Sequence, residues 1–561
     1  MSETPKQNPG FRWLVLVVMS LICFAQYFIY DSITPLGTMI KEPVNAVGRI
    51  LAFDPAAQTL TLQTEAGQRT FTVNFSVPTP KTSPEQPQPE SRTIVKLWTE
   101  QPSNDDPAAP SLSPAEIQSG RWAVVAFRDE GAQPKAVTVA LSDTKPAGVP
   151  QGGLGLSGAN YGLLFSAYAA ANVFLVMLLL AGVLVDKLGL KISGILYGFL
   201  CFLGAFLTAL GAWQGLPDLL GPLYPWLQTA FLPDWSPELK VMLLGRTIYG
   251  VGAEAILVVN NKVLARWFKG KELAFAYGMN LTIMRLGTFL ALNVQAPAAE
   301  AWGLRGALWF AAVVMLLGFF SFFVYLALER MGRPPQPAGG PAPEEAFRLR
   351  EAFSFTPSFW FISLLCVTFY SAVFPFQAFA PDILVQKFGY TETAAGHYTS
   401  ALIFGTMIFT PILGWFVDHK GKRATLMIIG SLLLIPCHLL LGYTHFPPVV
   451  PIFFVGVALS LVPAALWAAI PMMVPESRLG TAFGVIGYIQ NVGLMLFPWI
   501  AGKIADAHTV PGADGKPVVD YTSTMLLFAA LGVLGFAFAL LLKWADKRRT
   551  DGPSIEAVML K

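Results

Sequence analysis

Two residues of opposite charge stand out in this sequence because each lies in the middle of an apolar run. Glu254 interrupts the run GRTIYGVGAEAILVVNN, and Arg285 interrupts the run GMNLTIMRLGTFLALN. A charge at the centre of a membrane helix costs roughly 2.5–3.5 kcal/mol on insertion scales, so it needs a partner or a function. A carboxylate binds an ammonium group, and a guanidinium binds a carboxylate through two parallel hydrogen bonds. The two residues therefore predict a site for a zwitterion, and a structural ion pair is the alternative.

Apolar helices must position this acid and this base. The chain has 561 residues, of which 54% are hydrophobic and 13% charged, about half the charged fraction of a soluble protein. Its apolar residues come in blocks of about 20, the length that crosses a bilayer. Antiparallel helices at 240–265 and 273–295 would place Glu254 and Arg285 at similar depth. The predicted spans are 11–34, 158–181, 192–213, 240–265, 273–295, 302–329, 355–377, 396–417, 424–443, 449–472, 479–502 and 522–543.

The lysines and arginines are spread unevenly over the connecting segments, and this predicts an orientation. Cytoplasmic loops of membrane proteins carry an excess of these residues. With the N-terminus in the cytoplasm, the gaps after even-numbered spans are the basic ones, and the tail adds Lys543, Lys547, Arg548 and Arg549. Both termini are therefore expected in the cytoplasm. A net charge of only +3 gives no reason to expect a nucleic-acid partner.

Two segments differ in composition from the apolar spans. Residues 330–354 are rich in Pro, Gly and charge, which is typical of a flexible linker. Residues 42–152 contain alternating runs such as TLTLQT and RTFTVNF, interrupted by VPTPKTSPEQPQPE. They predict a small β-rich domain on the periplasmic side, which we call the insert, with a disordered internal loop. The predicted domains are 1–41 with the first helix, 42–152 as the insert, 153–329 completing the N-terminal bundle, 330–354 as the linker, 355–545 as the C-terminal bundle and 546–561 as a cytoplasmic tail.

A loop sequence occurs twice, at the same place in each predicted half. It reads GVLVDKLGLK at 182–191 and GWFVDHKGKR at 414–423. The second Gly of each copy supports a tight turn, and the Asp is suited to capping a neighbouring helix while pairing with a base. The pattern predicts a short, capped turn between two helices. The residues concerned are Asp186, Lys187, Asp418 and Arg423.

This repeated loop resembles the signature loop of the major facilitator superfamily, and the run RTIYGVG, which begins at Arg246, resembles a further motif of that family. The resemblance implies an all-α polytopic protein of 12 transmembrane helices in two six-helix bundles. The β-rich insert between helices 1 and 2 would be an addition to that fold. A transporter that works by alternating access is implied. The repeated loop, with Asp186, Lys187, Asp418 and Arg423, would then have a gating role rather than contact substrate, and Arg246 a structural or gating role.

A closer resemblance is to the lysosomal dipeptide transporter branch of that family. It rests on the stretch from Arg246 to Thr288, which contains WFKGKEL, and on shorter runs such as QYFIYDS and LGTAFGVIGYIQNVGL. It implies dipeptide transport by uniport, with the peptide amine at Glu254 and the peptide carboxylate at Arg285. The other positions implied to line the cavity are Tyr27, Tyr30, Asn261, Tyr370, Trp467, Gln490 and Asn491.

The insert has no counterpart in that branch, whose members carry an accessory subunit over the lumenal face. We expect the insert to cover the corresponding periplasmic face and to replace that subunit. The expected location is a bacterial inner membrane. The expected partners are a dipeptide and the lipid bilayer, and no cofactor or metal is expected.

Other functions stay open at this point. An organic-anion or monocarboxylate carrier would bind its substrate at Arg285 and keep Glu254 as a counter-charge. A proton-coupled peptide symporter would titrate Glu254 or Asp31, and a non-transporting sensor would use the insert as its input. An enzyme is not expected, because no nucleophile–base pair or metal cluster appears within the apolar spans.

Overall fold

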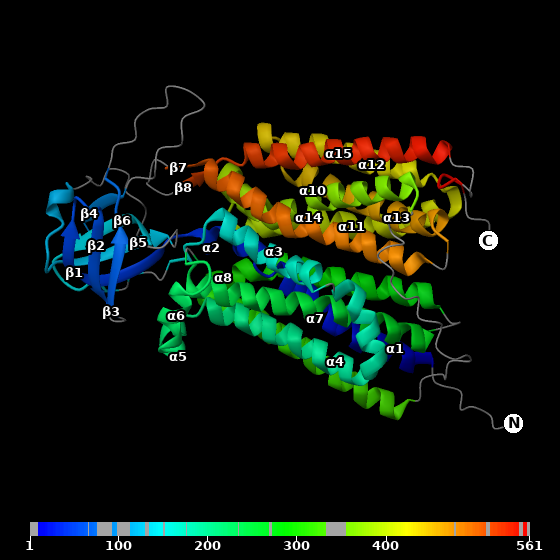
Figure 1. Ribbon diagram of the computed structural model, residues 1–561, viewed down its shortest axis with the longest axis horizontal. Helices are drawn as coiled ribbons and strands as arrows, with labels where there is room; N and C mark the ends of the chain where they lie inside the picture. Colours follow the sequence, from blue (N-terminus) through cyan, green and yellow to red (C-terminus); the bar gives the residue numbers. More distant parts are fainter. Residues whose placement is uncertain are drawn as a thin grey trace.

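Long helices account for most of the structure, because in a bilayer a helix satisfies its own backbone hydrogen bonds. The computed structural model describes residues 9–64, 67–75, 93–97, 113–128, 134–147, 149, 152–175, 177–233, 235–268, 272–332, 355–475, 478–511, 517–548 and 554–557. The helices form one bundle, and a β-sheet lies at one end of it (Figure 1). We call this end of the bundle the insert end and the opposite end the far end.

The first half of the bundle is built from long helices that pack side by side. They are α1 Pro9–Asp31, α3 Gly158–Phe174, α4 Met177–Gly211, α7 Pro237–Phe268 and α8 Leu273–Met331. α4 packs along α7, and α1 packs along α8. Short helices lie at the insert end, namely η1 Thr34–Leu36, α2 Gly37–Lys41, α5 Leu216–Leu220 and α6 Leu223–Thr229.

Two of these helices are broken at a glycine. Gly189 in α4 has φ 78° and ψ 157°, and Gly303 in α8 has φ 73° and ψ 164°. Glycine adopts such angles without steric cost. The 59 residues of α8 would measure about 88 Å as a straight helix, far more than a bilayer core of about 30 Å, so α8 turns back at Gly303.

The prediction that the second Gly of the first loop motif supports a turn is confirmed at Gly189. The extent predicted for that loop was wrong, because α4 begins at Met177 and most of 182–191 is helical. The predicted span 158–181 is likewise divided between α3 and the start of α4. Hydropathy marks an apolar block but not the point at which its backbone leaves the helix.

The second half contains six long helices among the described residues. They are α10 Pro357–Phe388, α11 Glu392–Lys420, α12 Arg423–Tyr443, α13 Val449–Met473, α14 Leu479–Ala507 and α15 Thr522–Lys547. A hairpin of β7 Thr509–Pro511 and β8 Pro517–Val519 precedes α15 at the insert end (Figure 1). Gly421, the second Gly of the second loop motif, has φ 66° and separates α11 from α12.

The two halves contact each other most closely near the insert end. α3 packs along α14, α8 packs along α11, and η1 and α2 contact α10. The approach of α3 to α14 is backbone to backbone, since a Cβ on Gly502 would lie 2.0 Å from the carbonyl oxygen of Gly158. Hydrogen bonds join the halves between the insert end and the middle of the bundle, among them those of Thr38 with Asp382, Gln377 with Asp31 and Asn172 with Asn491.

The strands of the insert form a closed sheet. They are β1 Val44–Asp54, β2 Thr59–Thr64, β3 Gly67–Thr72, β4 Ile94–Leu97, β5 Trp122–Arg128 and β6 Lys135–Ser142, with a single turn η2 at Pro114–Glu116. The strand order is β3-β2-β1-β5-β6-β4, and β3 also pairs with β6, so that five strands close into a barrel. Closure leaves few free strand edges.

The insert has its own hydrophobic core. Alternate side chains of its strands point inward, which is why the sequence alternates between apolar and polar residues. The buried residues include Ile50, Leu60, Leu62, Phe71, Val125, Phe127, Val139 and Leu141. The internal loop predicted to be disordered and most of the predicted linker 330–354 lie outside the described residues.

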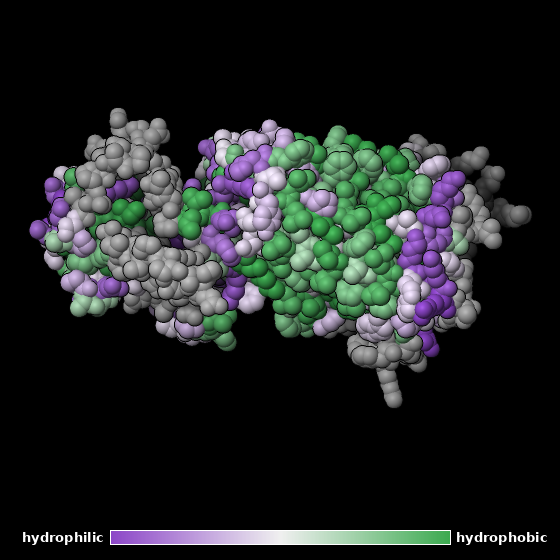
Figure 2. Space-filling view, turned by 90° about the horizontal axis from the view of Figure 1, so that it is seen from above, coloured by the Kyte–Doolittle hydropathy of each residue, from purple (hydrophilic) through white to green (hydrophobic). Residues whose placement is uncertain are grey.

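Apolar side chains form a belt around the bundle, with polar residues at both of its ends (Figure 2). Among the described residues, ten helices are long and apolar enough to cross a membrane. α8 counts once among these although it turns back at Gly303, and α3 is too short to be counted. The belt is the surface expected where lipid surrounds a polytopic protein.

Candidate substrate-binding site

Glu254 lies near the middle of α7, and its side chain is half-buried. The hydroxyl of Tyr168, on α3, donates a 2.6 Å hydrogen bond to its Oε1 atom. This distance is typical of a bond to a charged acceptor. The other carboxylate oxygen receives no hydrogen bond from the described part of the chain. Glu254 therefore has one oxygen positioned by the protein and one available to a ligand.

Arg285 lies on α8 at nearly the same depth as Glu254. The two helices are consecutive and meet at the far end, where α7 ends at Phe268 and α8 begins at Leu273. At about 1.5 Å per residue, Glu254 lies roughly 21 Å and Arg285 roughly 18 Å from that end. The two charges are thus close to the same level within the apolar belt.

The guanidinium of Arg285 is half-buried and makes no ion pair with a described residue. Its Cζ lies 5.9 Å from the centroid of the Tyr27 ring on α1, a cation–π contact. Tyr27 is within electrostatic range of both Arg285 and Glu254. The acid and the base therefore do not pair with each other, and the alternative of a direct structural ion pair between them does not hold in this structure.

Tyr370 and Trp467 in the second half lie near this cluster. The indole Nε1 of Trp467, on α13, donates a 3.0 Å hydrogen bond to the hydroxyl of Tyr370, on α10. Tyr370 is within electrostatic range of Arg285 and Tyr27. The two halves therefore approach each other at the depth of Arg285. Gln490, on α14, accepts a hydrogen bond from the thiol of Cys366 at 3.7 Å.

Asn491 links the halves directly. Its Oδ1 accepts a 3.2 Å hydrogen bond from Asn172 on α3, and its own amide donates to the carbonyl of Gly487 at 2.9 Å. Asn491 is almost fully buried, with 6% of its surface exposed. In this conformation its amide connects α14 to α3 rather than standing free for a ligand.

The two remaining predicted contacts lie on the first half. The ring of Tyr30 packs edge-on against that of Tyr168, with 5.0 Å between centroids. Asn261 is exposed, and it follows Glu254 by seven residues, about two turns along the same face of α7. Its carbonyl accepts a 3.1 Å hydrogen bond from the hydroxyl of Tyr277.

Arg246, one of the predicted gating residues, is buried within the first half. Its guanidinium donates to the carbonyls of Leu164, Ile29 and Tyr30 at 2.9, 3.1 and 3.2 Å. These bonds tie α7 to α3 and to α1. The contacts fit a structural role in holding three helices together, because none of them crosses to the second half.

Arg423 is also buried, and it holds a segment near the C-terminus. Its Nη1 donates to the carbonyls of Ile555 and Ala557 at 3.3 and 2.8 Å. The carboxylate of Glu556 accepts a 2.7 Å bond from the backbone N–H of Thr425, in the first turn of α12. The segment 554–557 therefore caps α12 at the far end of the bundle.

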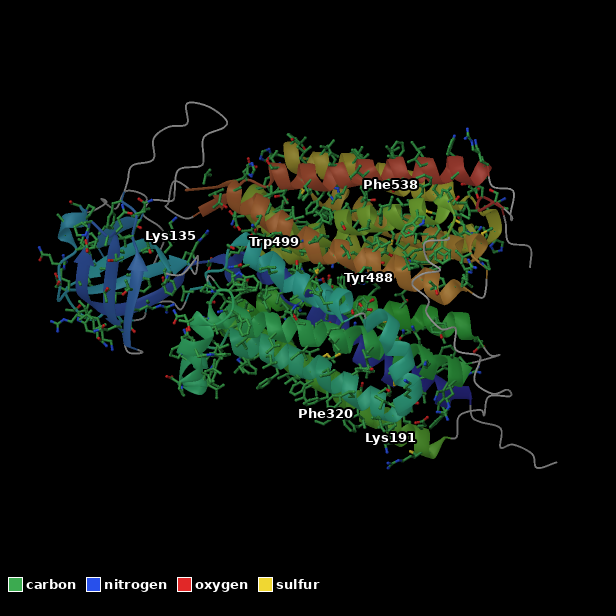
Figure 3. The ribbon with its side chains drawn as sticks, in the orientation of Figure 1. Lys135, Lys191, Phe320, Tyr488, Trp499 and Phe538 are labelled. Carbon is green, nitrogen blue, oxygen red and sulfur yellow. The ribbon has the colours of Figure 1, made fainter. Side chains whose placement is uncertain are left out.

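The other predicted gating residues lie at the far end. Lys187 is exposed, and Lys191 of the same motif marks this end in Figure 3, where Lys135 marks the insert. The side chains of Asp186 and Asp418 lie outside the described part of the structure. Their predicted capping and pairing therefore remain predictions.

Sequence reasoning missed Tyr168, the direct partner of Glu254. A tyrosine within the small-residue run SAYAAANV was the only available signal. A separate cavity of about 1200 Å³ lies between the insert and the first half, lined in part by Arg49, Trp122 and Arg305. None of the predicted substrate-binding residues lines it.

Two helical halves, an apolar belt and an unpaired acid and base inside the bundle are the features of a polytopic membrane transporter. Within the described ranges, His, Cys, Asp and Glu side chains form no group that could hold a metal ion. The profile of the Major Facilitator Superfamily matches residues 144–381 and 375–558. The chain therefore belongs to the major facilitator superfamily and is a multi-pass membrane transporter of a small molecule.

Relatives with curated names are similar over most of the helical part. The lysosomal dipeptide transporter MFSD1 of Danio rerio is 28% identical over 370 residues, which cover 63% of this chain and 74% of the relative. MFSD1 of Homo sapiens is 28% identical over 361 residues, covering 62% and 72%.

Solved structures share the fold at low sequence identity. The inward-facing, unoccupied structure of a bacterial homologue of the human lysosomal transporter Spinster covers 96% of this chain and 98% of its own, with a TM-score of 0.57 and 15% identity. The nucleoside transporter NupG covers 69% of this chain and 91% of its own, with a TM-score of 0.53 and 16% identity.

Proposed function

We propose that this transporter carries dipeptides by alternating access, as a uniporter. Glu254 binds the peptide ammonium group, and Arg285 binds the peptide carboxylate. The observation that carries the proposal is that this acid and this base lie half-buried at similar depth without pairing. An unpaired charge inside an apolar belt costs free energy. A zwitterionic solute bound between the acid and the base would pair with both and offset that cost. The similarity to proteins named as dipeptide transporters supports the same substrate class.

The side chains around the charges suit a solute whose own side chains vary. Tyr27, Tyr370 and Trp467 present apolar ring faces, while their polar ends accept or donate hydrogen bonds. Gln490 and Asn261 add amide groups. Such a lining binds a peptide backbone through a few directed bonds and accepts different side chains through non-directional contact.

We also propose a topology of twelve crossings. α3 with the first part of α4 makes the second crossing, the rest of α4 makes the third, and α8 makes the fifth and sixth on either side of Gly303. The basic residues of the far end, such as Lys191 and Arg266, favour a cytoplasmic location for that end, and we propose a bacterial inner membrane as the site of the protein. The insert is then periplasmic, and the contacts between halves at the insert end close the periplasmic side.

A thermal-shift screen of the purified protein tests the substrate class. A ligand at 100 times its Kd stabilises the folded state by about 2.7 kcal/mol. We expect dipeptides to raise the unfolding temperature more than free amino acids, tripeptides or monocarboxylates at equal concentration. A shift with monocarboxylates as large as that with dipeptides would overturn the zwitterion assignment in favour of an organic-anion carrier.

A proton-coupled peptide symporter is the second candidate, because Asp31 is a buried acid at the boundary between the halves. Its exposed fraction is 2%, and its Oδ1 accepts a 2.8 Å hydrogen bond from Gln377 on α10. Uptake of a dipeptide into proteoliposomes with and without an imposed pH gradient separates the two mechanisms. Equal rates support uniport. Acceleration that disappears in Asp31→Asn supports symport.

A further inference from the structure

The insert is joined to the bundle by two short segments that are bonded to each other. The segment before β1 accepts backbone hydrogen bonds at Ile40, Glu42 and Pro43 from the segment before α3, at distances of 2.8–3.3 Å. The donors are the N–H groups of Gly153, Leu154, Gly155 and Leu156. We call residues 37–43 and 152–158 together the root ribbon.

Glycine is required for this pairing. A Cβ on Gly153 would lie 2.1 Å from the carbonyl oxygen of Met39 and 2.5 Å from that of Glu42. A Cβ on Gly152, whose φ is +68°, would lie 2.3 Å from the carbonyl oxygen of Pro43. Any side chain at these positions would push the two segments apart, so the ribbon depends on the glycine pair at 152 and 153.

A carboxylate of the second half holds the first segment of the ribbon. Asp382, on α10, accepts a 2.7 Å hydrogen bond from the hydroxyl of Thr38 and forms an ion pair with Lys41. Tyr521, next to the start of α15, hydrogen-bonds to both Asp382 and Lys41. Asp382, Lys41 and Tyr521 are buried, with exposed fractions of 1%, 8% and 1%.

A second carboxylate holds the other segment. Asp506, near the end of α14, accepts hydrogen bonds from the backbone N–H groups of Gly158 and Ala159 at 2.6 and 2.8 Å. These N–H groups belong to the first turn of α3, where a helix has unsatisfied donors. Both ends of the ribbon are therefore bound to the second half by an aspartate.

Arg305 connects the same ribbon to the first half. From α8, it donates to the carbonyl of Gly153 at 3.3 Å and to the carbonyl of Ala212, at the end of α4, at 3.0 Å. These bonds lie within one half and do not have to break when the halves separate. The bonds to Asp382 and Asp506 do have to break.

We infer that the root ribbon is the gate at the insert end, that Asp382 and Asp506 hold it closed, and that the insert moves with the first half when it opens. The insert is then more than a passive cover. A ligand or partner that binds the insert only when the gate is closed, or only when it is open, shifts the equilibrium between those two states. By reciprocity, the state of the gate changes the affinity of that ligand by the same factor. This inference concerns the gate and does not depend on which solute is carried.

Distance measurements between spin labels test the inference. The described cysteines Cys23, Cys201, Cys366 and Cys437 are all buried, so labels are directed to engineered cysteines at exposed sites. Leu97 reports on the insert, Leu219 on the first half and Phe446 on the second half, with exposed fractions of 55%, 58% and 44%. The three pairs of these positions are measured in the otherwise unaltered protein and in gate variants.

The gate variants are Asp382→Asn, Asp506→Asn and their combination, so that the test does not depend on one variant folding. Glu300→Gln is the matched control, because Glu300 accepts a 2.7 Å bond from Thr393 of the second half but does not touch the ribbon. We expect the gate variants to lengthen the distances from Phe446 to Leu97 and to Leu219 together. The distance from Leu97 to Leu219 should stay unchanged, and the control should resemble the parent protein.

Two results would overturn the inference. If the distance from Leu97 to Leu219 changes as much as the others, the insert moves independently of the first half. If no gate variant changes any distance, the two carboxylates do not hold the gate. Neither readout requires substrate, so a failed dipeptide assignment would leave this test intact.

Discussion

Replacing Glu254 with Gln should remove recognition of the peptide amine while leaving the fold in place. Gln keeps an oxygen that can accept the 2.6 Å hydrogen bond from Tyr168, but it has no charge for an ammonium group. Truncating one partner of a buried charge pair costs about 2–5 kcal/mol. Because Glu254 is half-buried, we take the lower part of that range, about 2–3 kcal/mol, which corresponds to roughly 30- to 140-fold weaker binding.

The assay is calorimetric binding of a dipeptide and of its N-acetyl derivative to the parent protein and to Glu254→Gln. Acetylation removes the ammonium group, so the derivative should bind weakly to both proteins and with similar affinity. The penalty for the variant should thus appear only with the free dipeptide. Tyr168→Phe is the matched control, since it keeps the charge of Glu254 and removes one hydrogen bond. Loss of that bond should lower the free energy of unfolding by at most about 3 kcal/mol.

If Glu254→Gln weakened the binding of both ligands equally, the assignment would be refuted, because the effect would then have no connection with the amine. An unfolding temperature far below that of the parent would show that Glu254 holds helices rather than solute. The binding comparison and the melting curve together separate these two readings.

Three further substitutions have defined outcomes. Arg285→Lys keeps the positive charge but loses the two-pronged geometry, and we expect roughly tenfold or greater weakening of dipeptide binding, absent with a C-terminal amide. Arg246→Lys leaves buried carbonyls on α1 and α3 without donors, each costing about 1–3 kcal/mol, which should appear as a lower unfolding temperature; an unchanged melting curve would contradict the structural role. Glu556→Ala removes the cap from the N–H of Thr425 and should cost about 0.5–2 kcal/mol, measured by denaturation against Glu556→Gln, which keeps an acceptor.

Local sequence signals predicted most of the long helices and singled out the two central charges. An apolar block is visible in the sequence because lipid contact demands it along its whole length. An acid or a base within such a block is visible for the same reason, so Glu254 and Arg285 could be singled out before their surroundings were known. The strand runs of the insert coincide with β1–β6 because alternation reflects one buried face.

Contacts between distant segments could not be predicted in this way. Tyr168 meets Glu254 only because α3 turns that face toward α7. Hydropathy does not reveal which face of a helix points toward its neighbour when the helix is apolar all round. Lys41 and Asp382 are 341 positions apart, and each resembles an ordinary charge near a helix end. Their pairing follows from the packing of the two halves, which single-sequence periodicity does not specify.

The short helices at the insert end were missed for a related reason. α5 and α6 have five and seven residues, too few for an apolar period to be distinguished from a loop. A connection was expected between the predicted spans 273–295 and 302–329, but the helix breaks at Gly303, just inside the second of them. Glycine is common in membrane helices, so its presence alone does not mark a turn.

The central claim is that one acid and one base, left unpaired inside the bundle, hold the opposite ends of a zwitterion. An experimental structure of the protein with a bound dipeptide tests it most directly. We expect the peptide ammonium group within hydrogen-bond distance of Glu254 and its carboxylate facing the guanidinium of Arg285. A peptide bound elsewhere, or a direct Glu254–Arg285 ion pair persisting beside the bound peptide, would contradict the claim.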